Sequence, residues 1–380
     1  MKRFSLIFLS ALVIFMASCS KDDPQLPPDD AWVNDLSLPV PIQFGSGFSQ
    51  DLVTKVGYES LEDFDESVIF GIFGLDTDST DWSQDSPAVL LYNASSQFKD
   101  GKIGFRYNKQ VVTYYYPMEV SCNYTFYAYH TRNANVEHRV DDDDKDGYYV
   151  PITFGSDDVL WAKTEVVDEM ETQVGRDGFN SAYCRAVRKK GLPADIYMPN
   201  LKFEHLTTAL EFYAVGDNTE DPSLTDEDFS DVTVKKISIT NAVSGATLCI
   251  AHEDPGKEKT WSDVPGPEDA VTTVMSGIAT EGVHPTVGGG TLVGDGLFLY
   301  PQDTYDVEIV INSPKLSGKE DSVLKRSVSA TGGFKAGSKY RFDIVLKSPE
   351  LLDISITATE FADSTATIIG DNVFDENDAE

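Results

Sequence analysis

The chain has 380 residues, with 63 Asp and Glu against 30 Lys and Arg, so its formal net charge at pH 7 is −33. A surface this acidic repels phosphate backbones, which argues against a nucleic-acid partner and favours a solubilising role for the charge. The length suffices for two domains that each bury a hydrophobic core.

The first predicted element is a lipoprotein signal peptide at residues 1–18. Two basic residues precede the apolar run Phe4–Met16, which has the length of a signal-peptide core and is too short to span a bilayer. Two small residues then precede Cys19, in a pattern that resembles a bacterial lipobox. We therefore expect a lipid on Cys19 that anchors the chain to a membrane without a spanning helix. An ordinary signal peptide followed by a chance cysteine is the alternative.

Residues 19–38 are predicted to be an acidic, Pro-rich linker. The stretch SKDDPQLPPDD is polar and should extend, so that it holds the folded part away from the membrane. Its basic residue followed by two aspartates resembles the surface-export signal of Bacteroidetes lipoproteins. This implies the outer face of the cell outer membrane.

The rest of the chain is rich in short runs that alternate between apolar and polar residues, with the period of two that is typical of half-buried strands. Clear examples are YDVEIVIN at 305–312, YRFDIVLK at 340–347 and LDISITAT at 352–359. The run VTVKKISIT at 232–240 shifts phase at its two lysines, as a β-bulge would. Turn-rich segments separate the runs, and convincing long amphipathic helices are absent from the pattern. The fold class is therefore all-β, with antiparallel β-sandwiches.

We predict an N-terminal β-sandwich at residues 39–192, a C-terminal β-sandwich at residues 200–358 and an acidic tail at residues 359–380. The boundary is placed in RKKGLPADIYMPN, where a basic cluster, Gly and Pro interrupt the strand pattern. The segment NLKFEHLTTALEFYAV at 200–215 fits a helix or a strand.

The folded part has three cysteines, Cys122, Cys184 and Cys249, so at most one disulfide can form. Their spacing matches neither a disulfide framework nor a zinc site. Buried free thiols are favoured over a single bridge.

The run DDDDKDG places Asp142, Asp144, Asp146 and Gly147 on the D-x-D-x-D-G pattern of a calcium loop. The twelfth position is Thr153, so the bidentate Glu of such loops is missing. The two interpretations are a weak calcium site and a solvated acidic loop, and the second is favoured. No other cofactor is predicted.

No motif for an enzyme is present. The chain lacks GxSxG, HExxH, P-loop and dinucleotide-binding patterns. With 63 carboxylates, a pair suited to glycoside hydrolysis cannot be recognised from sequence. His205 lies in a strand-like apolar context that suits a packing residue better than a base.

A glycan-binding surface lipoprotein is the alternative function. Sugars stack on exposed aromatic rings, and VVTYYYPM at 111–118 together with Trp82, Trp161 and Trp261 offers such rings. Core packing is the competing use of the same side chains.

The order of motifs between about Pro41 and Thr357 resembles that of the fimbrillin-like lipoproteins of Bacteroidetes, the subunits of type V pili. The matching segments are FGIFGL (70–75), YYYP (114–117), YTFYAYH (124–130), DVLWAK (158–163), LKFEHLTTALEF (201–212), ISITNAVSG (237–245), LFLYPQ (297–302) and FKAGSKYRFDIVL (334–346). The resemblance implies two transthyretin-like β-sandwich domains in tandem, with the segment at 200–215 as a strand of the second. It also implies a non-catalytic subunit of a surface fimbrium that joins other fimbrial subunits by strand exchange and supports adhesion to host or bacterial surface ligands and biofilm formation.

In this family a trypsin-like protease removes the first strand, and the C-terminal segment of a neighbour fills the groove. Here the first-strand candidate is Pro41–Gly45, with Val40, Ile42 and Phe44 on one face. Lys55 is the only basic residue between Lys21 and Lys99, so the resemblance implies cleavage between Lys55 and Val56. Family processing often uses arginine, and an uncleaved anchor subunit is the alternative to a stalk or tip subunit. In the tail, TATIIG offers a short donor strand, which a stalk subunit needs and a tip subunit does not.

Overall fold

The computed structural model describes residues 31–48, 69–99, 102–108, 110–119, 122–165, 178–191, 198–313, 321–348 and 351–360. The predicted signal peptide, Cys19, the cleavage site at Lys55 and Val56, and residues 361–380 of the tail lie outside these ranges.

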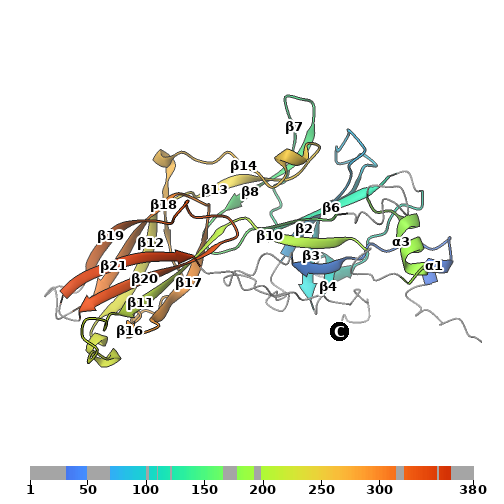
Figure 1. The fold of residues 1–380 in the computed structure, drawn as a ribbon. Coiled ribbons are helices and arrows are strands. Elements are labelled where there is room, and N and C mark those ends of the chain that lie inside the picture. The colour runs from blue at the N-terminus through green and yellow to red at the C-terminus, as the bar shows by residue number, and fades with distance from the viewer. Residues whose placement is uncertain are drawn as a thin grey trace, which may run out of the picture.

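An eight-stranded sheet forms the centre of the N-terminal half (Figure 1). In sheet order its strands are β1 (Gly45–Phe48), β10 (Asn200–His205), β9 (Leu160–Lys163), β6 (Tyr124–His130), β2 (Ile69–Asp76), β3 (Val89–Lys99), β4 (Lys102–Tyr107) and β5 (Gln110–Val112). Neighbouring strands are antiparallel except β1 and β10, which run parallel.

The central strands of this sheet are buried on both faces. In β2, Phe70 and Ile72 belong to one hydrophobic core, whereas Phe73 and Leu75 belong to another on the opposite face. Because successive side chains of a strand point to opposite faces, a nearly continuous apolar run such as IFGIFGL suits a strand with two buried faces.

Two different layers cover the two faces. The first core includes side chains of α1 (Ala31–Asn34) and α3 (Ser181–Lys189), two short helices in contact with each other. The second core lies against a four-stranded sheet, whose strands in order are β14 (Trp261–Ser262), β13 (Gly245–His252), β8 (Asp146–Thr153) and β7 (Glu137–Val140). The 3₁₀-helix η4 (Pro255–Lys257) lies between β13 and β14.

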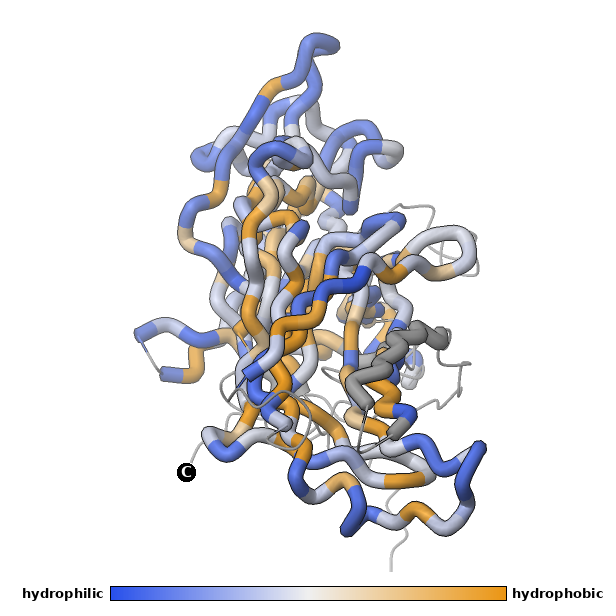
Figure 2. Tube along the Cα trace, turned by 90° about the vertical axis from the view of Figure 1, so that its left-hand side faces the viewer, coloured by the Kyte–Doolittle hydropathy of each residue, from blue (hydrophilic) through white to orange (hydrophobic). Residues whose placement is uncertain are grey.

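The C-terminal half is a sandwich of two sheets around a third core. One sheet contains β16 (Thr286–Val287), β11 (Thr208–Gly216), β20 (Lys339–Ser348), β21 (Leu351–Glu360) and β17 (Thr291–Leu299), which also pairs with β11. The other contains, in order, β15 (Val271–Val274), β12 (Thr233–Ala242), β18 (Thr304–Asn312) and β19 (Ser322–Ser329). The connections include the 3₁₀-helices η3 (Asp226–Phe229) and η5 (Pro267–Asp269). Figure 2 shows apolar positions along the strands and hydrophilic positions in many of the turns.

The fold class is confirmed: the described chain is mostly β-strand in several antiparallel sheets, with few helices. The alternation in β18 is also confirmed, because Tyr305, Val307, Ile309 and Ile311 are all buried. The predicted bulge in β12 appears as a register shift between Val234 and Lys236 opposite β18.

Three features differ from the expectations. The pairs β1–β10, β11–β16 and β11–β20 are parallel, so pairing is not wholly antiparallel. The ambiguous segment at 200–215 is two strands, not one strand of the second sandwich: β10 belongs to the eight-stranded sheet and β11 to the C-terminal sandwich. The hairpin β13–β14 also pairs with β8 of the N-terminal half. The domain limits at 192 and 200 stay a prediction. Strands β10 and β13, which follow residue 200 in the chain, nevertheless pair with strands of the N-terminal half and so cover edges of its sheets.

Helix α3 is a fourth feature that the sequence pattern did not predict. Asn180 caps it by accepting a hydrogen bond from the backbone N–H of Tyr183 at 2.9 Å. Tyr183, Cys184 and Val187 form its buried stripe, and basic residues occupy its last turn. Such a short helix gives a weak pattern in the sequence. Across the described residues, no helix is long and apolar enough to cross a membrane.

Candidate functional site

The segment that precedes and includes β1 fills a groove in the N-terminal half. Val40, Ile42 and Phe44 are 0%, 4% and 3% exposed, while Pro41 and Gln43 between them are half-buried. This confirms the predicted alternation, but the predicted strand bounds are wrong: Pro41 forms an isolated bridge with Tyr115, and the regular strand β1 begins at Gly45.

The backbone of this segment pairs with one edge of the eight-stranded sheet and with the short stretch of chain that follows β5. The N–H of Ile42 donates to the carbonyl of Tyr114 at 2.8 Å, and the N–H of Tyr116 donates to the carbonyl of Val40 at 2.9 Å. These partners follow β5, the last strand of the sheet, whereas β1 pairs with β10 beside the opposite edge and also contacts β4. One continuous segment, residues 40–48, therefore satisfies backbone groups of β10 and of residues 114–116.

Aromatic rings of Phe105, Tyr116 and Phe126 line the base of the groove that residues 40–48 fill; we call them the aromatic floor. The ring of Phe44 packs edge to face against Phe105 of β4 and Phe126 of β6, with centroids 5.8 and 5.1 Å away. Tyr116 contacts Phe126 from another side, at 6.1 Å between centroids. Edge-to-face contacts add to the stabilisation from burial alone.

Helix α3 contacts the chain just before residues 40–48. The guanidinium of Arg185 donates to the carbonyl of Asp35 at 2.9 Å and to the carbonyl of Leu38. Trp32 and Val33 of α1 are buried in the same core, so the predicted linker at residues 19–38 is wrong for residues 31–34, which form a helix packed on the domain. These contacts of Arg185 were not predicted from the sequence. The Asn180 cap and the basic last turn were the available signals for the helix that carries it.

This arrangement can support strand replacement. Loss of residues 40–48 would leave backbone donors and acceptors unpaired on β10 and on residues 114–116 and would expose the rings of Phe105 and Phe126, which is the kind of surface that an added strand recognises. The predicted cleavage site at Lys55 lies outside the described residues, after β1 and before β2 in the chain.

The structure does not bring the three predicted calcium ligands together. The carboxylate of buried Asp146 accepts from the backbone N–H of Trp82 at 2.6 Å and lies 3.2 Å from Nε2 of His138. Asp142 and Asp144 are exposed in the turn before it. Within the ranges that the structure describes, no three His, Cys, Asp or Glu side chains form a candidate metal site.

The same turn is closed by a carboxylate that the sequence pattern did not single out. Asp141 accepts backbone hydrogen bonds from Asp143 and Lys145 and forms an ion pair with Lys257 of η4. The hydrogen bond from Lys257 holds the pKa of Asp141 well below its usual value. The acidic run is thus tied to the hairpin β13–β14.

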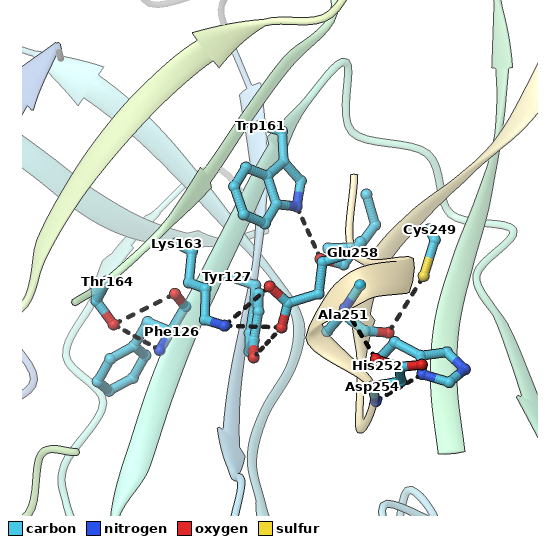
Figure 3. Close-up of polar contacts among 12 residues, drawn as sticks. Phe126, Tyr127, Trp161, Lys163, Thr164, Cys249, Ala251, His252, Asp254 and Glu258 are labelled. Atoms are coloured by element: carbon cyan, nitrogen blue, oxygen red, sulfur yellow. Dashed lines mark hydrogen bonds and ion pairs between the residues drawn. The ribbon is translucent and has the colours of Figure 1, made fainter. Parts of the chain in front are cut away.

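A second polar cluster fastens this hairpin to the eight-stranded sheet (Figure 3). The buried carboxylate of Glu258 accepts from Nζ of Lys163 at 2.8 and 2.9 Å and from the hydroxyl of Tyr127 at 2.9 Å. Burial, together with the nearby Glu258 charge, raises the pKa of Tyr127 well above its usual value, so the hydroxyl stays a donor. Trp161 adds a hydrogen bond from Nε1 to the carbonyl of Ile250 at 2.8 Å.

His205 is buried, as its apolar context predicts, but it is also ion-paired. Its Nδ1 contacts Asp158, whose other carboxylate oxygen accepts from the hydroxyl of Thr207 at 2.6 Å. Burial lowers the pKa of His205, but the charge and hydrogen bond of Asp158 outweigh burial, so the net shift is upward. The pair joins the ends of β9 and β10 and is inaccessible to a substrate.

All three cysteines of the folded part are free thiols. Cys184 and Cys249 are buried and Cys122 is half-buried. Burial raises the pKa of both Cys184 and Cys249 to about 12, so these thiols are poor nucleophiles at neutral pH.

Core packing takes most of the aromatic residues considered for glycan binding. Trp82 and Trp161 are buried, and Trp261 packs against Phe154 with 5.2 Å between ring centroids. Of the tyrosines at 114–116, only Tyr115 is largely exposed. The rings needed for a sugar-stacking platform are therefore dispersed.

The model of a family described as fimbrillin-like matches residues 54–360 of the chain. The chain belongs to the fimbrillin-like family. Membership supports a role as a fimbrial subunit at the cell surface, in association with other fimbrial components. No curated protein matches the sequence of this fimbrillin-like protein.

Several solved structures are similar to this fimbrillin-like protein. A proposed cell adhesion protein from Bacteroides ovatus has 12% identity and a TM-score of 0.48, with 85% of this chain and 96% of that chain covered. Another from Bacteroides uniformis has 16% identity and a TM-score of 0.44, with 84% and 98% covered. The fimbrial anchor protein Mfa2 from Porphyromonas gingivalis has 10% identity and a TM-score of 0.33, with 87% and 99% covered.

Proposed function

We propose that the protein is a lipid-anchored precursor of a stalk or tip subunit of a surface fimbrium, with residues 40–48 as a provisional strand that a neighbouring subunit replaces. The observation that carries the proposal is the dual pairing of this segment, which bonds to strand β10 and to residues 114–116 after β5 while Val40, Ile42 and Phe44 are buried in the core. The anchor is the lipid on Cys19, which places the precursor on the cell outer membrane. Adhesion and biofilm formation follow from the filament, and the subunit itself needs no catalysis.

Cleavage after Lys55 does not release the segment by itself. Each of the three plugged side chains contributes roughly 1.5–3 kcal/mol through burial, so the cut segment stays bound until another strand competes for the groove. The competitor must present apolar side chains at alternate positions, because only one face of the groove is apolar. This requirement restricts which strands can replace the segment.

The test begins with limited trypsin digestion of the purified lipoprotein. We expect a cut between Lys55 and Val56 and slow growth of linear oligomers, visible by size-exclusion chromatography and electron microscopy. Lys55→Gln should remain intact and monomeric. Deletion of residues 361–380 should reduce the oligomers of a stalk subunit and leave those of a tip subunit unchanged.

A peptide experiment tests the groove directly. A fluorescent peptide with the sequence of residues 38–48 should bind the trypsin-treated protein but not the intact protein. The same peptide with Phe44→Asp should not bind, because a carboxylate would lie against the aromatic floor. Equal binding of the two peptides, or a cut protein that never accepts either one, would contradict strand replacement.

A further inference from the structure

Helix α3 carries a concentration of positive charge on a strongly acidic chain. Arg185, Arg188 and Lys189 lie on its C-terminal half, Lys190 is its C-cap, and the helix contains no Asp or Glu. Lys189 and Lys190 are exposed. Cations at this end also favour the helix dipole, so the charge by itself has an explanation within the helix.

Exposed apolar side chains beside these cations need another explanation. Leu36 and Met118 are 74% and 51% exposed, and together with Lys189 they line a hollow of about 500 Å³ between α1 and α3. Tyr115, close by in the chain, is 45% exposed. Stabilisation of the helix does not require large apolar side chains in solvent. A basic surface that also exposes apolar side chains is typical of contact with a lipid headgroup layer.

The position of this face in the molecule suits such a contact. Figure 1 shows α1 and α3 at the end of the molecule opposite β19 and β21. The first described residue, Ala31, belongs to α1, and only residues 20–30 separate it from Cys19. A fully extended chain of that length reaches roughly 40 Å, which is the largest separation that an anchor on Cys19 allows; docking of the face requires this linker to be less extended than its composition alone predicts.

We propose that this face, formed by Leu36, Met118, Lys189 and Lys190, docks the precursor onto an anionic lipid surface. The proposal rests on the lipid anchor of the proposed function. The net charge of −33 does not prevent it, because salt screens charges beyond about 10 Å and the bilayer then senses the local cations. Asp35 and Glu119 share the region, and the stretch between Cys19 and α1 adds four aspartates against one lysine, so the attraction depends on the cations of α3 alone.

Docking would be confined to the unprocessed protein. Leu36 lies on the N-terminal side of Lys55, so strand replacement removes half of the apolar part of the face. The membrane contact and the provisional strand would be lost in the same step, which frees the subunit for the filament.

The experiment uses the complete lipidated protein in vesicles of phosphatidylcholine alone or of phosphatidylcholine with phosphatidylglycerol. Lysine acetylation is followed by mass spectrometry. We expect Lys189 and Lys190 to react roughly fivefold more slowly on anionic vesicles, with the protection lost in high salt. Lys325 on β19, whose side chain is 71% exposed, is the internal control and should react equally on both vesicles.

Leu36→Ser combined with Met118→Ser should remove most of the protection while leaving the fold intact, since both side chains are exposed. Equal labelling of bound protein on the two vesicles would overturn the docking face and leave the anchor standing. Protection that rises with protein density on neutral vesicles would also overturn it, because a second copy would then cover the face. A protein that stays on neither vesicle would refute the anchor on Cys19 and this inference with it.

Discussion

The ring of Phe44 meets the ring of Phe126 edge to face, with 5.1 Å between centroids and 88° between the ring planes. This contact joins the provisional strand to β6, a central strand of the eight-stranded sheet. Burial of the provisional strand and packing of the N-terminal core therefore share this contact.

Phe44→Ala should lower the free energy of unfolding of the intact protein by about 3–5 kcal/mol, because it removes a buried ring and leaves a cavity. Urea denaturation followed by tryptophan fluorescence measures the loss. Leu36→Ala is the matched control and should change stability by less than about 0.5 kcal/mol, since Leu36 is exposed. After a replacing strand has displaced the segment, the wild-type and Phe44→Ala proteins should be equally stable. A persistent difference would place Phe44 outside the exchanged segment.

Lys163→Met should destabilise the protein by about 1–3 kcal/mol, because it leaves the Glu258 carboxylate buried, with the Tyr127 hydroxyl as its remaining hydrogen-bond donor among the described residues. Solvent screening limits the loss of stability, because the Lys163 side chain is 27% exposed. Adding Glu258→Gln should restore part of the loss, since the buried charge is then gone. The control is Lys325→Met, which breaks an exposed pair with Glu308 and should cost less than about 1 kcal/mol. Equal losses at the two sites, measured by urea denaturation, would show that Glu258 does not clamp the hairpin.

The pair of His205 and Asp158 predicts a pH dependence of stability. The pKa of His205 is raised in the folded state above the ordinary value of 6.5, so the folded protein binds the proton more tightly than the unfolded chain. The contribution is fully present below pH 6.5 and is lost as the pH rises through the folded-state pKa. Over that window the free energy of unfolding should fall by up to about 1.4 kcal/mol per pH unit.

His205→Gln isolates this contribution. Subtracting its stability curve from that of the wild type, between about pH 6 and about pH 9, should leave the predicted fall. Thr207→Val removes the hydrogen bond to Asp158 but keeps the histidine. Its free energy of unfolding should therefore be lower at every pH, with the same decrease as the pH rises. A difference curve that is flat, or that rises with pH, would rule out a charged His205 in the folded protein.

Calcium should leave the melting temperature unchanged at millimolar concentration. A ligand that binds only the folded state raises stability by mass action, but Asp146 is already engaged by Trp82 and His138, away from the exposed carboxylates of Asp142 and Asp144. Differential scanning fluorimetry with calcium and with chelator measures this. Magnesium is the control for non-specific screening of the acidic surface. A rise with calcium alone that disappears in Asp144→Ala would establish the site.

Much of the strand content can be predicted from the sequence, because a half-buried strand leaves its period in the residues themselves. The buried positions of β18 and the bulge in β12 follow directly from that period. The alternation of Val40, Ile42 and Phe44 likewise predicts a strand-like plug before its groove is known. The pattern of α3 is too short to stand out in this way.

The sequence by itself determined that the chain is all-β, that residues 40–44 bury one face, and that the fimbrillin-like motifs follow in order. Only the tertiary structure decided which strands become neighbours. The segment at 200–215 splits between two sheets because each open edge takes the strand that reaches it, and hydrogen bonding along an edge does not depend on side-chain identity. The contacts of Glu258 with Lys163 and of Arg185 with the carbonyls of Asp35 and Leu38 have the same origin. They join residues far apart in the chain, and a local pattern carries no record of such distant partners.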